Sequence, residues 1–372
     1  MPASHSLPVA DQFSDLAELA DAPRLWKAIL DASPDAGVWS TYSNYLFRLA
    51  YLQARRALVA DRSFVLFHDG QPCGLAPVVL ARDDEIDEVV ASYGGISLAW
   101  PVAVPGIGDP LEIERKVLDE VERRSRDGGA GQLSLMFAPA DGGPECAGRF
   151  HRIVRERHFI DTSYMAQCVE VSHDTLNTVR DRYRRYVRKF RDKYDLRIIG
   201  ADNVNESLAA TYMDLHVKDA GTVSRPLITY ERQVDQVRAG EAFFVCAHKP
   251  SEDQIAGMLL IQLFKSAAFD ASVAVDPRFE NEGVSYLLKW RAIEHLVEIG
   301  VRHYELGRAA VSPSFDWLPS PKNYSISFFK DGWTRGRLRP VWCAERFYST
   351  QALSRYLDRK KAALVRHFSL CD

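Results

Sequence analysis

The chain of 372 residues has few of the features that mark secreted, membrane-spanning or metal-binding proteins. Its six cysteines are scattered, without a Cys-x-x-Cys pair or a Cys/His group at metal-ligand spacing, so we expect reduced, buried thiols and no metal site. No basic stretch followed by an apolar core opens the sequence, and no apolar run approaches the roughly 18 residues of a membrane span. These absences predict a cytoplasmic protein without a transmembrane segment.

The chain also has little net charge. Lys and Arg number 47 and Asp and Glu 50, which gives a formal net charge of -3 and argues against a protein dedicated to coating DNA. Hydrophobic residues make up 47% and charged residues 26%, as in ordinary globular proteins. At about 150 residues per domain, a chain of 372 residues is too long for one small module.

Two segments of the sequence show the same order of predicted elements. The first has strand patterns at 63–68 and 74–81, a helix at 110–126 and a strand at 132–137. The second has strand patterns at 242–248, 256–264 and 266–275, a helix at 283–298 and a strand at 302–306. We interpret them as two copies of one α/β (α+β) unit with mixed sheets; chance likeness of two generic α/β segments is the alternative.

The expected boundaries follow from this duplication. We predict an N-terminal helical segment at 1–38, a first domain at 39–172, a second domain at 173–345 and a C-terminal helix at 346–372. A basic helix at 179–194 opens the second domain. Its apolar and aromatic positions recur at helical spacing and predict an inward stripe, while arginines and lysines crowd the remaining face. That face indicates phosphate binding, with a merely solvated basic face as the alternative.

A second segment, 304–342, carries groups suited to chemistry. A strand ends at Gly307 and Arg308, a loop rich in proline and serine follows, and a strand is predicted at 324–329 with Lys330 at its end. Loops held by rigid strands often carry binding groups, and cations flanking an aromatic loop suit a ligand with anionic or developing negative charge. An ordinary surface loop is the alternative.

These residues carry a resemblance to a known family. The sequence YELGRA, the tyrosine at 324 and the sequence FFKDGW resemble the end of the second domain in FemAB-like proteins of the GNAT acyltransferase superfamily, and RRYVRKFRDKYDLRI is similar to the Arg-rich helix of that family. The resemblance implies two tandem GNAT-like domains, each with a mixed, mostly antiparallel sheet flanked by helices. It also implies amide formation between an amine and an acyl or aminoacyl donor.

Under this resemblance the donor is an aminoacyl-tRNA or an acyl-CoA, used as a co-substrate with no tightly bound cofactor. The acceptor is an anionic cell-envelope precursor on a glycan carrier or a small metabolite, which leaves room for peripheral contact with a membrane. A non-catalytic tandem GNAT protein that binds an anionic glycan carrier or polymer is the alternative function.

The candidate site residues divide by role. Attack on an acyl carbon creates an oxyanion that needs a fixed cation, and Lys330 stands at the matching motif position. The candidates for a general base on predicted strands are Glu305 and Asp270. The candidates for substrate binding are Arg308, Tyr324, Arg185, Arg188 and Trp333.

Two turns bear on the choice of donor. GNAT enzymes hold the pyrophosphate of coenzyme A on a turn that opens a helix. At 276–285, Arg278 and Gly283 have the wrong spacing for that turn, and Glu280 and Glu282 would repel a pyrophosphate, which favours a tRNA-borne donor. The glycine-rich turn at 104–110 predicts either a simple turn or an anion site.

Overall fold

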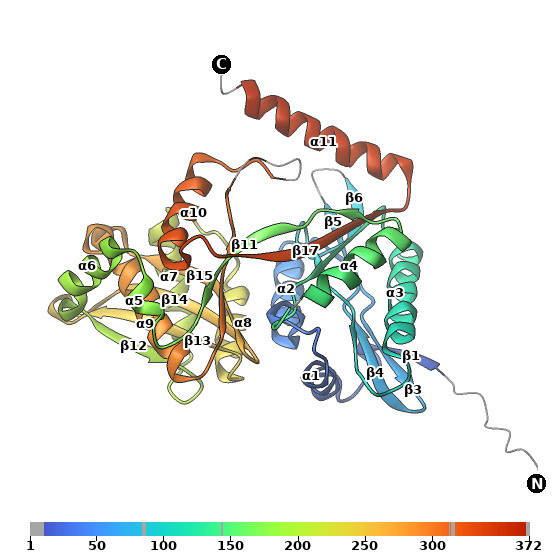
Figure 1. The fold of residues 1–372 in the computed structure, drawn as a ribbon, viewed down its shortest axis with the longest axis horizontal. Helices are drawn as coiled ribbons and strands as arrows, with labels where there is room; N and C mark the ends of the chain where they lie inside the picture. The colour runs from blue at the N-terminus through green and yellow to red at the C-terminus, as the bar shows by residue number, and fades with distance from the viewer. Residues whose placement is uncertain (1–10, 84–86, 143, 312, 314–316, 370–372) are drawn as a thin grey trace, which may run out of the picture. The chain divides into compact units, whose positions relative to one another are not determined.

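The computed structural model of the chain describes residues 11–83, 87–142, 144–311, 313 and 317–369. It divides into two compact units, unit 1 (1–162 and 342–359) and unit 2 (163–341 and 360–372) (Figure 1). The strand β17 (Leu338–Phe347) begins in unit 2 and ends in unit 1, and the helix α11 (Thr350–Ser369) follows it. Each unit therefore includes a segment from late in the chain, and the strand β17 crosses from one unit into the other.

Unit 1 contains two sheets. The smaller sheet has the order β1-β3-β4-β8, and the larger has the order β17-β9-β6-β5-β2, with β7 beside β9 and β10 beside β17. The strands are β1 (Asp11–Asp15), β2 (Leu58–Asp61), β3 (Phe64–His68), β4 (Gln71–Ala76), β5 (Val79–Asp83), β6 (Glu88–Ala91), β7 (Leu98–Ala99), β8 (Val102–Ala103), β9 (Gln132–Phe137) and β10 (Ile160–Asp161). The helices are α1 (Ala22–Ala32), α2 (Tyr42–Ala54), α3 (Pro110–Asp127) and α4 (Pro144–Glu156).

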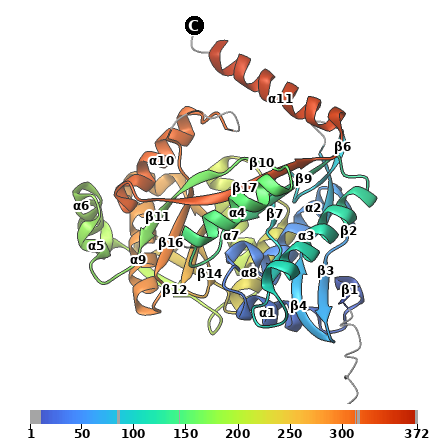
Figure 2. The same ribbon diagram turned by 45° about the vertical axis from the view of Figure 1, so that its right-hand side comes forward.

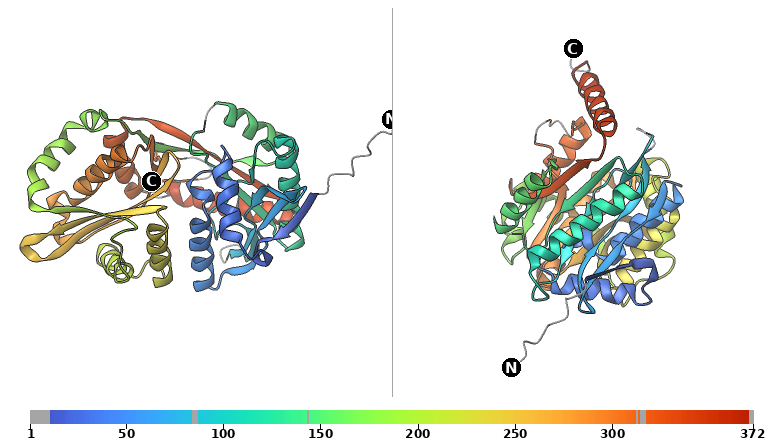
Figure 3. Two further views of the ribbon diagram at one scale, coloured as in Figure 1. Left: turned by 90° about the horizontal axis from the view of Figure 1, so that it is seen from below. Right: turned by 90° about the vertical axis from the view of Figure 1, so that its right-hand side faces the viewer.

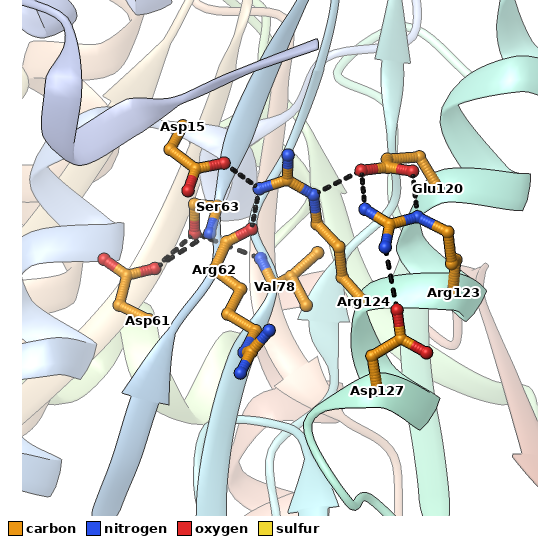
Figure 4. Close-up of polar contacts among 9 residues, drawn as sticks. All are labelled: Asp15, Asp61, Arg62, Ser63, Val78, Glu120, Arg123, Arg124 and Asp127. Carbon is orange, nitrogen blue, oxygen red and sulfur yellow. Dashed lines mark hydrogen bonds and ion pairs between the residues drawn. The ribbon is translucent and has the colours of Figure 1, made fainter.

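A buried arginine ties α3 to the sheets of unit 1 (Figure 4). The Arg124 guanidinium donates to the carboxylate of Asp15, to the carbonyl of Arg62 at 3.0 Å and to Glu120 at 2.6 Å. Arg123 neutralises Glu120 from the other side at 2.6 Å. Because paired charges are the ones that proteins bury, this network holds α3 in register with β1 and with the turn before β3.

Unit 2 is built on one sheet with the order β12-β13-β14-β15-β16-β11-β17. All neighbours are antiparallel except β15 and β16, which run parallel. The strands are β11 (Tyr164–Glu170), β12 (Asp195–Ile199), β13 (Ala242–Lys249), β14 (Gln254–Phe264), β15 (Ala267–Val275) and β16 (His303–Arg308).

Helices cover both faces of this sheet, as the left view in Figure 3 shows. The helices of unit 2 are α5 (Thr175–Thr178), α6 (Asp181–Phe190), α7 (Leu208–Ala220), α8 (Leu227–Arg238), α9 (Val284–Glu298) and α10 (Pro321–Thr334). Alternate residues of β13 point into different cores: Phe243 and Val245 join the core under α6 and α9, and Phe244 and Cys246 join the core under α7 and α8. This period of two is what a strand covered on both faces requires.

The predicted fold class is confirmed: the structure has two α/β units with mixed, mostly antiparallel sheets. Some predicted elements are wrong. The run 74–81 is two strands, β4 and β5, and the segment 324–329 lies in the helix α10. The predicted N-terminal helical segment contains the strand β1 ahead of α1, and residues 1–10 of that segment lie outside the described residues. None of the helices in the described ranges combines the length and apolar character needed to cross a bilayer.

Candidate functional site

The site lies in unit 2 where β15 and β16 part. Their parallel pairing covers three positions and ends at Phe269 and Glu305, while both strands continue beyond that point. On its other side β16 pairs with β11, and the register shifts around Leu306, so this part of β16 contains a bulge. Bulges redirect side chains and occur often beside functional sites. Glu305 and Gly307 flank this irregularity.

The Glu305 side chain is partly buried, and the pKa of its carboxyl is perturbed. Burial raises the pKa of its carboxyl to about 7, against the opposing influence of the cations Arg339 and Lys330. Its Oε1 atom is buried and has no hydrogen-bond partner among the described residues. A carboxylate with a pKa near neutrality and an unoccupied acceptor atom is suited to take a proton.

Lys330 is the cation of the site. Burial lowers the pKa of its ammonium group, while the charges of Asp270 and Glu305 act in the opposite direction. Gly307 has a φ of +88°, and a β-carbon placed on it would lie 3.4 Å from the Lys330 Nζ atom. The glycine thus leaves the space beside the ammonium group open and adopts a backbone conformation that other residues rarely tolerate.

Replacing Gly307 with alanine should lower both stability and turnover. The positive φ would cost roughly 1 kcal/mol or more, and the new methyl group would press on the Lys330 ammonium and reduce acyl transfer about tenfold. Gly300→Ala is the matched control, since Gly300 has a φ of +75° with no atom near its added β-carbon. Thermal unfolding and steady-state rates separate the effects. Equal turnover in both variants would contradict the role of Gly307.

Asp270 is engaged in an ion pair. Its carboxylate contacts the Nζ atom of Lys289 on α9, and both side chains are less than 10% exposed. The same Nζ atom lies 3.1 Å from the hydroxyl of Tyr304, whose pKa is raised by burial and by Asp270. A carboxylate held by a buried ammonium is a poor proton acceptor, so the structure argues against Asp270 as the general base and leaves Glu305.

Lys330 projects from a helix, in contrast to the predicted strand end. The α10 helix begins with a capping box in which the Ser320 hydroxyl accepts from the backbone N–H of Asn323 and the Asn323 side chain accepts from the backbone N–H of Ser320. Pro321 occupies the first helical turn. These residues are a helix-start signal that the strand prediction overlooked. The helix is fixed to β11 by a hydrogen bond of 2.9 Å from the Gln167 side chain to the Ser327 carbonyl.

The two aromatic candidates on α10 lie apart from the ammonium group. Trp333 is 1% exposed and packs in the core against Tyr183, and its contact with substrate stays a prediction. Tyr324 is 36% exposed in the first turn of α10. It precedes Lys330 by six residues, or about 9 Å of helix rise, and the structure does not bring the two side chains together.

The arginine candidates divide into two places. The Arg308 guanidinium lies between the rings of Tyr164 and Trp317, at 4.8 and 4.4 Å from their centroids. Stacking of this kind orients a guanidinium plane and its donors. Arg185 and Arg188 are exposed on α6, and no contact among the described residues joins them to Lys330 or Arg308.

The helix α6 matches the predicted basic helix. Tyr183, Val187 and Phe190 are buried in the core that the sheet and α9 share. Figure 2 shows α6 next to α5. The opposite face carries cations without a carboxylate within 4 Å among the described residues. We call this set, with one lysine from the 3-10 turn that follows the helix, the α6 basic face: Arg182, Arg185, Arg188, Lys189 and Lys193.

The turn before α9 is occupied by the protein itself. Arg278 is held by Asp276 at 2.7 Å, and Glu282 accepts from Lys249 and from the Tyr194 hydroxyl, both at 2.8 Å. A β-carbon on Gly283 would meet aromatic rings of α6 at 3.2 and 3.5 Å. The helix start where a GNAT enzyme would hold a pyrophosphate is therefore occupied by ion pairs within the protein and covered by rings of α6.

The glycine-rich turn of unit 1 has the geometry of a simple turn. Gly106 and Gly108 have φ values of +85° and +72°, and the Asp109 carboxylate caps α3 by accepting from the backbone N–H of Leu111 at 3.1 Å. The capping carboxylate supplies the negative charge that an anion would otherwise bring to the helix start.

The sequence reasoning missed three groups that shape the site: Lys289, Tyr304 and Arg339. Lys289 stands alone among apolar residues in the middle of a predicted helix, and a lone lysine on an apolar face is a signal for a buried ion pair. Arg339 influences Glu305 from β17, and no local pattern predicts that contact, because the pairing of β17 with β11 joins distant parts of the chain.

Comparison with known proteins supports this fold. A model of the acetyltransferase (GNAT) domain matches residues 177–316. A search of curated proteins finds no significant match. The chain is similar to the crystal structure of FemX, with 11% identity, a TM-score of 0.65, and coverage of 94% of this chain and 99% of FemX.

Two further solved structures share the architecture across most of their length. The L-PGS structure from Bacillus licheniformis has 12% identity, a TM-score of 0.56, and coverage of 93% of this chain and 97% of its own. A tandem GNAT protein from the clavulanic acid biosynthesis pathway has 15% identity, a TM-score of 0.52, and coverage of 91% and 99%. The chain therefore has the fold of these tandem GNAT structures, and its residues 177–316 match the GNAT acetyltransferase domain model.

Proposed function

We propose that the protein is an acyltransferase that forms an amide between an amine acceptor and an activated acyl group, with aminoacyl-tRNA as the favoured donor. The observation that carries this proposal is the combination of a buried Glu305 carboxyl, with its pKa raised to about 7, and a Lys330 ammonium whose pKa is lowered by burial, on a GNAT fold. Titratable groups with opposite perturbations are typical of acid–base sites.

The chemical step assigns one role to each group. The amine nitrogen attacks the acyl carbonyl carbon, and the developing oxyanion is stabilised by the Lys330 ammonium. Glu305 accepts the proton that the amine loses. When the tetrahedral intermediate collapses, the new C–N bond remains and the bond to the leaving group breaks. The leaving oxygen of a tRNA ester, or sulfur of a thioester, receives a proton.

The preference for an RNA donor comes from unit 2. Its α9 turn bears Glu282 and is covered by rings of α6, which disfavours the pyrophosphate of an acyl-CoA. The α6 basic face offers cations for a phosphate-bearing ligand. FemX and L-PGS share the fold, and this likeness supports transfer of an acyl or aminoacyl group in general.

A donor comparison tests the proposal. The protein is incubated with a pool of charged tRNAs, or separately with acyl-CoAs, together with candidate amines, and mass spectrometry is used to search for an amide. We expect an amide from the charged tRNAs. An amide only from acyl-CoA would overturn the donor preference, and no amide from either donor with a folded protein would support the alternative, a binding protein for an anionic glycan carrier or polymer.

Neutralising Arg185 and Arg188 together to glutamine should weaken binding of the anionic substrate. We expect KM to rise roughly fivefold to tenfold at low salt, and the difference to shrink at high salt because exposed charges are screened. The control changes Arg24 and Arg82, two exposed arginines of unit 1, in the same way. A rise in KM that is independent of salt, or one equal to the control, would count against this role.

A further inference from the structure

A pocket of about 320 Å³ lies in unit 2 between the start of α6 and the end of α10. Its lining consists of Arg180, Asp331, Arg335 and Gly336. Two guanidinium groups face one carboxylate there, so the lining has a net positive charge. A space of this size holds several water molecules or one phosphate group, and neither of the arginines belongs to the site around Lys330.

Arg180 is oriented before any ligand arrives. Its Nη2 atom donates to the Asp331 carboxylate at 2.8 Å, and its guanidinium carbon lies 4.4 Å from the centroid of the Phe328 ring. The ring fixes the guanidinium plane, and the ion pair uses one of its five N–H donors. Its Nε and Nη1 atoms have no hydrogen-bond partner among the described residues, so the arginine retains donors in the geometry that binds an oxyanion.

Arg335 has a backbone conformation that residues other than glycine rarely adopt. It ends α10 in the left-handed region, with φ of 56° and ψ of 40°, at the position where glycine is strongly preferred. Its Nη1 atom donates to the carbonyl of Thr178 at 3.0 Å, which holds the side chain beside the start of α6. The hydrogen bond and the helix end together fix the guanidinium at the pocket wall, next to Gly336.

The start of α6 adds to the positive potential of the pocket. Arg180 is the N-cap residue of this helix, and no side chain caps it. Helix starts favour negative charge, and the α6 basic face continues the cationic surface along the helix. Asp181 in the first turn is neutralised by Arg184.

We propose that this pocket binds a phosphate group of a substrate, between the guanidinium groups of Arg180 and Arg335. The bound phosphate would share Arg180 with Asp331, which follows Lys330 on α10. Phosphate binding would therefore weaken an ion pair that holds α10, the helix that carries the Lys330 ammonium. The inference concerns binding alone and does not depend on the acyl-transfer chemistry proposed above.

Binding of inorganic phosphate to the full chain, measured by isothermal titration calorimetry, tests the proposal. We expect Arg335→Gln to weaken binding about tenfold and Asp331→Asn to strengthen it several-fold, because the first removes a charged donor and the second removes a competing anion. Arg337→Gln is the matched control, since Arg337 is an exposed arginine two residues away that pairs with Glu170. Dimethyl phosphate in a parallel titration distinguishes a terminal phosphate from a phosphodiester.

A second variant separates binding from folding. Arg335→Gly relieves the left-handed conformation, so we expect a thermal unfolding midpoint no lower than that of the parent together with the same loss of phosphate affinity as Arg335→Gln. Two results would overturn the proposal: no detectable binding of phosphate to the parent chain, or equal phosphate affinities in Arg335→Gln and Arg337→Gln. Failure of the amide assay would leave this result unaffected.

Discussion

Replacing Lys330 with alanine should lower turnover for amide formation by roughly 10²–10³, the usual loss when a fixed oxyanion donor is removed. The ammonium group makes no hydrogen bond or ion pair to another described residue, and Arg339 remains as a cation acting on Glu305 when Lys330 is removed. The thermal unfolding midpoint should therefore stay close to that of the parent.

Lys322→Ala is the matched control for this experiment. Lys322 lies on the same helix, in its exposed first turn. Lys330→Ala should have a kcat roughly 10²–10³ lower than that of Lys322→Ala. The loss should appear in kcat because the oxyanion exists only after attack. Turnover in Lys330→Ala equal to that in Lys322→Ala would remove Lys330 from the reaction.

Glu305→Gln should abolish the acidic limb of the pH profile and lower turnover by roughly 10²–10⁴. A general base acts in its charged form, and burial raises the pKa of this carboxyl to about 7. In the parent, kcat/KM should therefore fall as the pH drops below about 7 and level off above it. At high pH the rate should fall again as Lys330, whose pKa is lowered by burial, loses its proton.

The control for Glu305→Gln is Glu170→Gln. Glu170 lies on the neighbouring strand β11 with a mostly exposed side chain. This variant should keep both the rate and the acidic limb. A pH profile that is unchanged in Glu305→Gln would contradict the assignment of the base, whatever its effect on the rate, because a positioning role alone does not move an apparent pKa.

The sequence was informative where local patterns determine structure. The alternation of buried residues in β13 and the stripe of Tyr183, Val187 and Phe190 on α6 are local, and both were predictable. The segment 324–329 was predicted as a strand, although Ser320 and Pro321 mark the start of a helix. Local signals conflicted there, and the capping residues decided the outcome.

The site was predictable only in part, because it depends on contacts between distant segments. The sequence offered Lys330 and Glu305 as candidates, but the burial that perturbs the pKa of both groups arises from packing. Asp270 had the pattern of an available base, and its partner Lys289 is 19 residues away on α9. The role of β17 in both units also depends on pairing partners that no local pattern reveals.

The central claim is that unit 2 forms amide bonds at Lys330 and Glu305. The most direct measurement is single-turnover transfer of a labelled aminoacyl group from charged tRNA to an amine, followed in parallel for the parent chain, Lys330→Ala and Lys322→Ala. We expect a labelled amide from the parent and Lys322→Ala, and a rate lower by roughly 10²–10³ in Lys330→Ala. A folded parent that forms no amide, or a Lys330→Ala variant as fast as the parent, would contradict it.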